Sequence, residues 1–216
     1  MDIAAQLAKN APLVAALVLI FTFLMMLTAF SSLAIAGLTL LLNIASVGAA
    51  YGLVVLVFQD GLGAGLLGFT KNGGITSWVP LFMFVILFGI SMDYHVFVVS
   101  RVKEAHSRGL TTAQAIREGV ISSVGVITNA AVVMIAVAAI FGMTPELSMK
   151  ETGLGMAAAV LIDGTLVRTV LLPAWMHLLG EANWLMPRWL GWLPVTPLAE
   201  HATKATPTDE PISADL

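Results

Sequence analysis

The stretch Val79 to Arg101, VPLFMFVILFGISMDYHVFVVSR, sets the class of this protein, because it is long and apolar enough to cross a lipid bilayer yet carries a carboxylate, Asp93, deep inside. An ionised carboxylate in hydrocarbon costs several kcal/mol unless it is paired, hydrated or protonated, so such a residue is functional by default. Asp93 lies about 12 Å along a helix axis from Arg101, which is too deep for its side chain to reach the interface easily. We therefore favour a functional carboxylate over one that only caps the span.

Composition indicates a membrane protein. The 216 residues are 58% hydrophobic and 11% charged, and the apolar residues occur in long runs. The net charge of -3 gives no case for nucleic-acid binding. The chain has no cysteine, which excludes disulfides, thiolate nucleophiles and cysteine-bound metals, and we expect neither a cofactor nor a metal site. The first apolar stretch is too long for the core of a signal peptide, so we expect an uncleaved membrane helix there.

Five apolar runs are each close to the roughly twenty residues that a membrane-spanning helix needs. The predicted fold is therefore all-α: a polytopic bundle of five transmembrane helices within residues 1–180, with a short cytoplasmic helix in addition. Beyond the bundle we expect an interfacial segment rich in Trp and Arg over 181–194 and a disordered tail over 195–216. The predicted spans are 11–30, 33–58, 78–100, 120–141 and 153–179.

Basic residues predict the orientation in the membrane. The segment after the third span holds four of them and is placed on the cytoplasmic side, whereas Lys9, Lys71 and Lys150 stand alone on the other side. With five crossings, the N-terminus then faces outward and the C-terminus lies in the cytoplasm, in a bacterial plasma membrane. An outward start suggests that the chain is the downstream part of a larger protein. The four basic residues are Arg101, Lys103, Arg108 and Arg117.

Two local spacings predict how helices start and pack. Thr111 is followed three residues later by Gln114, the spacing of a capping box, so we expect the short cytoplasmic helix to begin there and to lie at the membrane surface. In the second span, Gly48 and Gly52 form a GxxxG spacing, which is typical of close packing between membrane helices.

Further polar residues lie inside the spans. The fifth span carries Asp163 near mid-depth and Arg168 five residues later. Five residues turn an α-helix by about 140°, so the two do not form an ideal pair along one helix, and we favour a helix-packing salt bridge to a neighbouring span over a transport role. In the fourth span Ser122 and Asn129 share a polar stripe, which either hydrogen-bonds to an adjacent helix or lines a hydrated path.

The residues that follow Asp93 bear on what it can do. Tyr94 lies about 100° round the helix from Asp93, so the two side chains seek partners on different helices. A tyrosine hydroxyl can donate to a carboxylate and hold it while it waits for a proton. His95 is a possible second proton carrier, although a packing or headgroup role is the favoured interpretation. An aspartate that is neutral when protonated and paired when ionised can couple proton flow to a change of conformation.

Three stretches resemble the last membrane block of the MMPL family, within the resistance-nodulation-division (RND) superfamily: FGISMDYHVFVVSRVKEA, VITNAAVVMIAVAAIFG and GLGMAAAVLIDGTLVRTVLLPAWMHLLGEANWLMPRWL. The resemblance implies two homologous membrane halves, each with a large extracytoplasmic domain, and proton-driven export of lipids or hydrophobic compounds. It also implies that Asp93 and Tyr94 belong to a proton relay and contact an equivalent pair on the other half. The chain departs from the family pattern at His95, often acidic there, and at Gly125, often basic.

The leading prediction is a proton-coupled exporter module, not an enzyme. It would lie in the lipid bilayer, carry a lipid or hydrophobic substrate and need a homologous partner half, either a separate chain or a second copy. One alternative is a structural or remnant half-transporter that moves nothing. A remote one is an intramembrane aspartyl protease, which would require Asp93 and Asp163 to share a proton. No spacing of Ser, His and Asp suggests a nucleophilic triad.

Overall fold

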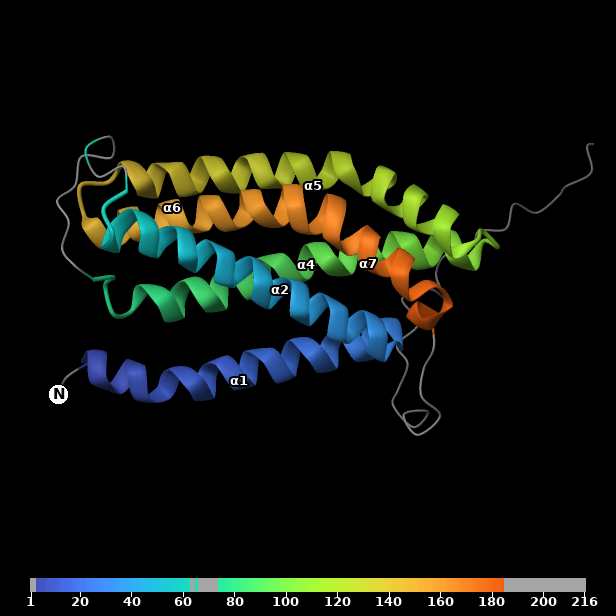
Figure 1. Ribbon diagram of the computed structural model, residues 1–216, viewed down its shortest axis with the longest axis horizontal. Helices are drawn as coiled ribbons and strands as arrows, with labels where there is room; N and C mark the ends of the chain where they lie inside the picture. Colours follow the sequence, from blue (N-terminus) through green and yellow to red (C-terminus); the bar gives the residue numbers. More distant parts are fainter. Residues whose placement is uncertain (1–2, 63–64, 66–73, 185–216) are drawn as a thin grey trace, which may run out of the picture.

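A computed structural model describes residues 3–62, 65 and 74–184. The regular structure in that part of the chain is helical, and five of its helices are long and apolar enough to span a membrane (Figure 1). The predicted all-α bundle of five spans is therefore confirmed. Lys71 lies outside the described residues, as do the predicted disordered tail and most of the interfacial segment, from residue 185 onward.

The spans follow one another along the chain with short connections on one side. The first two are α1 (Ile3–Phe30) and α2 (Leu33–Val54), which continues into the π-helical turn η1 (Val55–Gln59). The third and fourth are α4 (Val79–Ser107) and α5 (Thr112–Met143). The fifth is a continuous run of α6 (Leu147–Ile162), the π-helical segment η2 (Asp163–Leu171), α7 (Leu172–Leu179) and the 3₁₀ turn η3 (Gly180–Trp184).

A two-residue turn joins α1 to α2. Ser31 adopts a left-handed backbone conformation, with φ 53°, which reverses the chain. Ser32 then caps α2, because its hydroxyl accepts the N–H of Ile35 at 3.2 Å. From α4, Lys103 Nζ donates to the Phe30 carbonyl at 3.1 Å and so places a cation at the C-terminus of α1.

The helices form one bundle with α1 at its edge (Figure 1). α5 packs along both α6 and α4, whereas α2 packs against α6 and α4, and α1 packs against α2 and α4. The close approach of α5 to α4 depends on Gly119. A Cβ atom at this position would lie 2.5 Å from Val102 Cγ2 and 2.7 Å from Val102 Cα, so a larger residue does not fit without a shift of the backbone.

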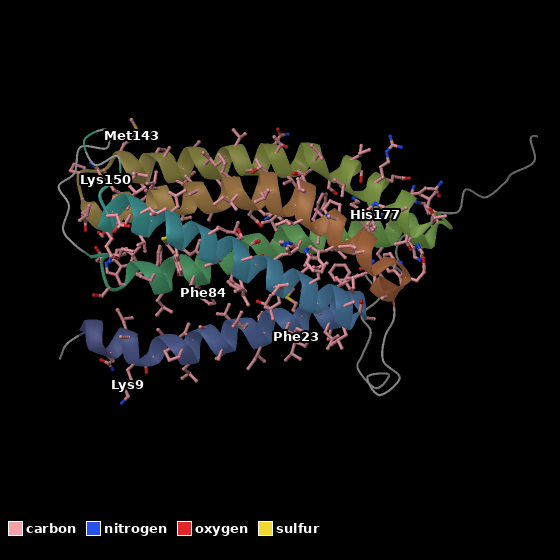
Figure 2. All side chains as sticks on the ribbon, viewed as in Figure 1. Lys9, Phe23, Phe84, Met143, Lys150 and His177 are labelled. Carbon is pink, nitrogen blue, oxygen red and sulfur yellow. The ribbon has the colours of Figure 1, made fainter. Side chains whose placement is uncertain are left out.

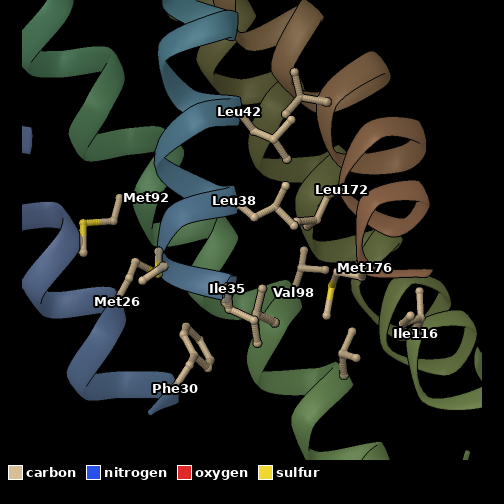
Figure 3. Packing of buried hydrophobic residues seen from close by; sticks show 14 of the residues in the cluster. Met26, Phe30, Ile35, Leu38, Leu42, Met92, Val98, Ile116, Leu172 and Met176 are labelled. Atoms are coloured by element: carbon tan, nitrogen blue, oxygen red, sulfur yellow. The ribbon is translucent and has the colours of Figure 1, made fainter. Parts of the chain in front are cut away.

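Buried side chains form two apolar clusters that are separated by a polar layer. One cluster lies toward the end at which α1 meets α2 and includes Met26, Ile35 and Val98 (Figure 3). The other lies toward the opposite end and includes Val54 and Phe88. On α2, α4 and the fifth span alike, the change from one cluster to the other coincides with a buried polar residue. Those residues are Asn43, Ser91 and Asp163.

The predicted short cytoplasmic helix is the first part of α5. Its start is as predicted: in the capping box, Gln114 N donates to Thr111 Oγ1 at 3.4 Å and Thr111 N donates to Gln114 Oε1 at 3.2 Å. The prediction that it is separate from the fourth span was wrong. A glycine weakens an isolated helix, so a break at Gly119 was expected. In the structure Gly119 packs closely on Val102, and the helix α5 continues through it.

The end of the fifth span is tied to the connection between α4 and α5. The Trp184 ring stacks on His106, with ring centroids 4.3 Å apart and planes 4° from parallel. Trp184 Nε1 donates to Thr112 Oγ1 at 3.1 Å, and the Thr112 hydroxyl donates to Glu181 Oε1 at 2.6 Å. These contacts hold η3 beside the start of α5.

Candidate functional site

Asp93 lies in the middle of α4 and faces away from the bundle. Its side chain is exposed and makes no hydrogen bond or ion pair with the residues that the structure describes. Gly89, one turn earlier on α4, is also exposed, and a Cβ atom built there meets nothing within 4 Å. The two residues form an uncovered strip at the depth of the apolar core. A carboxylate at this depth requires a partner or a proton.

Tyr94 is half-buried. Its side chain points in a different direction from that of Asp93, because consecutive residues of a helix are about 100° apart. Its hydroxyl donates to Met134 Sδ on α5 at 3.2 Å. The guanidinium of Arg168 lies over its ring, 4.3 Å from the centroid, in a cation–π contact. Thus one of two adjacent residues faces out of the bundle and the other faces into it.

The polar layer joins three helices through Ser91. Its hydroxyl lies 2.9 Å from Asp163 Oδ2 and also contacts Asn43 Oδ1. His95 is fully buried one turn later on α4, with Nδ1 2.8 Å from the Ser91 carbonyl, and its Nε2 has no hydrogen-bond partner among the described residues. Sequence reasoning missed Ser91. The available signal was a hydroxyl four residues before His95, on the same face of an otherwise apolar helix.

Asp163 and Arg168 form a buried ion pair within the fifth span. The expectation that helical spacing keeps them apart, and that a neighbouring span supplies the partner, was wrong. The reason is that η2 is π-helical. Hydrogen bonds in a π-helix link residues five apart, so side chains at that spacing lie on the same face. Asp163 Oδ1 and Arg168 Nε remain without a hydrogen-bond partner among the described residues.

The predicted polar stripe of α5 lies on an exposed face. Ser122 Oγ donates to the Gly119 carbonyl of its own helix at 3.1 Å. Asn129 is exposed and makes no side-chain hydrogen bond with the part of the chain that the structure describes. Neither residue joins the polar layer, so the stripe makes no hydrogen bond to another of the described helices.

The two intramembrane aspartates are not brought together. Asp163 is buried and paired with Arg168, whereas Asp93 is on the outer face of α4. Aspartyl protease chemistry requires two carboxylates that share a proton. This pair of residues does not provide that arrangement.

Comparison with known proteins gives the chain a family. The model of the MMPL family matches residues 1–192. A protein named heme uptake protein MmpL11, from Mycobacterium tuberculosis, is 39% identical over 185 residues, which cover 86% of this chain and 19% of that protein. The trehalose monomycolate exporter MmpL3 of Mycolicibacterium smegmatis is 36% identical over 185 residues, or 86% of this chain and 18% of the relative. The membrane protein YdfJ of Bacillus subtilis is 37% identical over 194 residues, which cover 88% of this chain and 26% of that protein.

The chain therefore spans about a fifth to a quarter of the length of these relatives. The names of MmpL3 and MmpL11 describe transport by those proteins. The family match extends over all five membrane-length helices, from the start of α1 to beyond the end of η3. This chain, with five helices long and apolar enough to span a membrane, belongs to the MMPL family.

Proposed function

We propose that this chain is one membrane half of a proton-driven exporter of lipids or other hydrophobic compounds, with Asp93 and Tyr94 as its proton relay. The observation that carries the proposal is the exposed Asp93 carboxylate in the middle of a membrane-length helix. Ionisable groups at such depth mark proton or ion pathways. Names of relatives support lipid export: in Mycolicibacterium smegmatis, MmpL3 is named a trehalose monomycolate exporter and MmpL11 an exporter of mycolic acid-containing lipids.

A second membrane half supplies the partner for Asp93. Three exposed glycines on outer faces of the bundle support this, because a Cβ atom at their positions would meet nothing within 4 Å. They are Gly89 on α4 and Gly48 and Gly52 on α2. The close packing predicted for the GxxxG pair therefore has no partner helix within the described part of the chain. Small residues let membrane helices approach closely. The partner half is a homologous chain or a second copy of this one.

The relay works through a change of partner. Ionised Asp93 needs hydrogen-bond donors or a cation, whereas protonated Asp93 is neutral and can lie against apolar side chains. Tyr94 is half-buried and its hydroxyl is bound to Met134 Sδ, a weak acceptor, so a stronger acceptor such as a carboxylate can compete for that hydroxyl. The two protonation states then favour two arrangements of the halves, which is the requirement for coupling proton flow to transport.

We assign the other polar residues of the core to helix pairing. Asp163 and Arg168 are each other's partner in a buried position, and His95 is fully buried beside Ser91. A proton that crosses the membrane needs a carrier group that is accessible from both sides. Asp93 is exposed on the outer face of α4 and can be such a group. Ser122 and Asn129, exposed on α5, are available to the partner half or to a hydrated path.

A pocket beside α1 suits a hydrophobic substrate. It has a volume of about 320 Å³ and lies between the N-terminal half of α1, the end of α2 and the start of α4. The lining is mainly alkyl and aromatic and includes Pro12, Leu81 and Phe84, the last of which Figure 2 labels on the side of α4 toward α1. Ligand pockets commonly have volumes of about 300–1,000 Å³. The apolar lining fits a hydrocarbon chain.

The proposed orientation places the N-terminus outside and the C-terminus in the cytoplasm, in a bacterial plasma membrane. Lys9 and Lys150 lie at one end of the bundle and His177 lies toward the other (Figure 2). The connection between α4 and α5, which carries Arg108, is at the same end as α7. An excess of basic residues marks the cytoplasmic side of a membrane protein.

Efflux in bacterial cells that produce the complete transporter tests the relay. Asp93→Asn keeps the size of the side chain and removes its titratable proton, so we expect proton-driven efflux of a lipid substrate to be lost while the amount of protein in the membrane stays normal. Glu118→Gln is the matched control, because this exposed acid pairs with Arg108 at 2.5 Å near the cytoplasmic start of α5. It should leave efflux unchanged. Normal efflux by the Asp93→Asn variant would refute the relay.

A further inference from the structure

The Asp163–Arg168 ion pair touches α4 at two points. Asp163 Oδ2 lies 2.9 Å from Ser91 Oγ, and the Arg168 guanidinium lies 4.3 Å from the centroid of the Tyr94 ring. Ser91 and Tyr94 are three residues apart, so both contacts fall on neighbouring positions of one face of α4. We call these four residues the α4 clamp.

Two contacts of different kinds restrict the rotation of α4 about its own axis. Residues that follow Ser91 are placed by that rotation: Asp93 lies about 200° round the helix from Ser91. With Ser91 held on the fifth span, Asp93 must point to the outer face of α4. That is where the structure has it.

The clamp depends on the π-helical geometry of η2. In an α-helix Asp163 and Arg168 would diverge by about 140°, and the two could not contact one face of α4 together. In η2 they are paired, with both side chains buried. π-helical segments are rare, and those that occur are frequently found at functional sites, so we expect η2 to have a function.

We propose that Asp163 and Arg168 are positioning residues for Asp93: paired on η2, they hold α4 at the rotation that presents Asp93 to the partner half. They carry no proton themselves. The importance of this positioning for transport rests on the proposed function. The rotation of α4 itself can be measured without any transport assay.

Two readouts report the clamp in the chain reconstituted in lipid nanodiscs. The chain has two tyrosines and no cysteine. Fluorotyrosine labelling therefore gives two fluorine NMR resonances, which Tyr51→Phe assigns, and the Tyr94 resonance reports the stack with Arg168. The rotation of α4 is reported by the distance between nitroxide labels on Gly89→Cys and Val132→Cys, because both positions are exposed and lie on different helices.

Three variants test the proposal. Asp163→Asn breaks the pair, so we expect the Tyr94 resonance to move and the label distance to change, while the Tyr51 resonance stays. Gly164→Ala is the control, because a Cβ atom there meets nothing within 4 Å, and should leave both readouts unchanged. Deletion of Gly164 places the charged residues four apart, the spacing at which α-helical side chains meet, so both readouts should stay near their wild-type values.

Unchanged readouts in the Asp163→Asn variant would overturn the proposal, as would a displaced Tyr94 resonance in the deletion variant whose Tyr51 resonance is normal. In the complete transporter, Asp163→Asn should lower the maximal rate of efflux without moving the midpoint of its pH profile. A moved midpoint would make Asp163 a proton carrier and overturn the positioning role. If Asp93→Asn retained efflux while the two readouts behaved as expected, the proposed function would fail and the clamp would stand.

Discussion

Two aspartates near the middle of this bundle have opposite surroundings. Asp163 is 5% exposed and paired with Arg168, whereas Asp93 is exposed and has no partner among the described residues. A buried charge is tolerated when its partner is present in the same chain. A charge on the outer face of a membrane helix is tolerated when something else covers it. The contrast separates a charge that is paired within this chain from one that, under the proposed function, is covered by a partner half.

The largest expected effect is a loss of stability when the buried Asp163–Arg168 pair is broken. Arg168→Ala leaves Asp163 as an uncompensated buried carboxylate, which costs about 3–5 kcal/mol. We expect the free energy of unfolding, measured by denaturant titration in mild detergent, to fall by that amount. The double variant Asp163→Leu with Arg168→Met removes both charges and should be much more stable than the single variant. A single variant as stable as the wild type would show that the ion pair does not stabilise the fold.

Two glycines extend the contrast from charges to packing. Gly119→Ala forces a Cβ atom against the Val102 backbone, and overpacking of this kind costs about 1–3 kcal/mol. Gly48→Ala, on the open face of α2, should change the stability of the isolated chain by less than about 0.5 kcal/mol. Thermal unfolding of the two variants in the same detergent gives the comparison. Equal losses would mean that the face of α2 is packed within the chain.

The smallest expected effect on stability is at Asp93. Asp93→Asn should alter the free energy of unfolding of the isolated chain by no more than about 0.5 kcal/mol, because the carboxylate contacts no described group that it could leave unpaired. Its effect should instead appear as weaker co-purification with the partner half. A loss of stability as large as that of Arg168→Ala would show that Asp93 has a partner within its own chain.

Much of the fold follows from local patterns. Long apolar runs predicted the five spans, because a lipid environment leaves few alternatives to a helix of that length. The capping box at Thr111 was also predictable, since it depends only on residues three positions apart. These features need no knowledge of which helices are neighbours.

Other features depend on contacts that the sequence does not display. The Asp163–Arg168 pair was missed because a spacing of five is unfavourable in an α-helix, and no residue pattern marks η2 as π-helical. The continuity of α5 through Gly119 depends on Val102, which is far from it in the sequence. The outward direction of Asp93 was also not predictable, because α4 is apolar on most of its circumference and the sequence does not say which side its neighbours cover.

The edge position of α1 has a mechanical consequence. This helix forms one wall of the pocket of about 320 Å³ and packs against α2 and α4. The hydrogen-bonded residues around Ser91 all come from other helices. Displacing α1 sideways would widen the pocket while leaving every one of those bonds in place. Under the proposed function, the pocket can thus change its width for different cargo while the Asp163–Arg168 pair and the bonds of Ser91 stay in place, so binding the cargo and moving the proton are separable tasks.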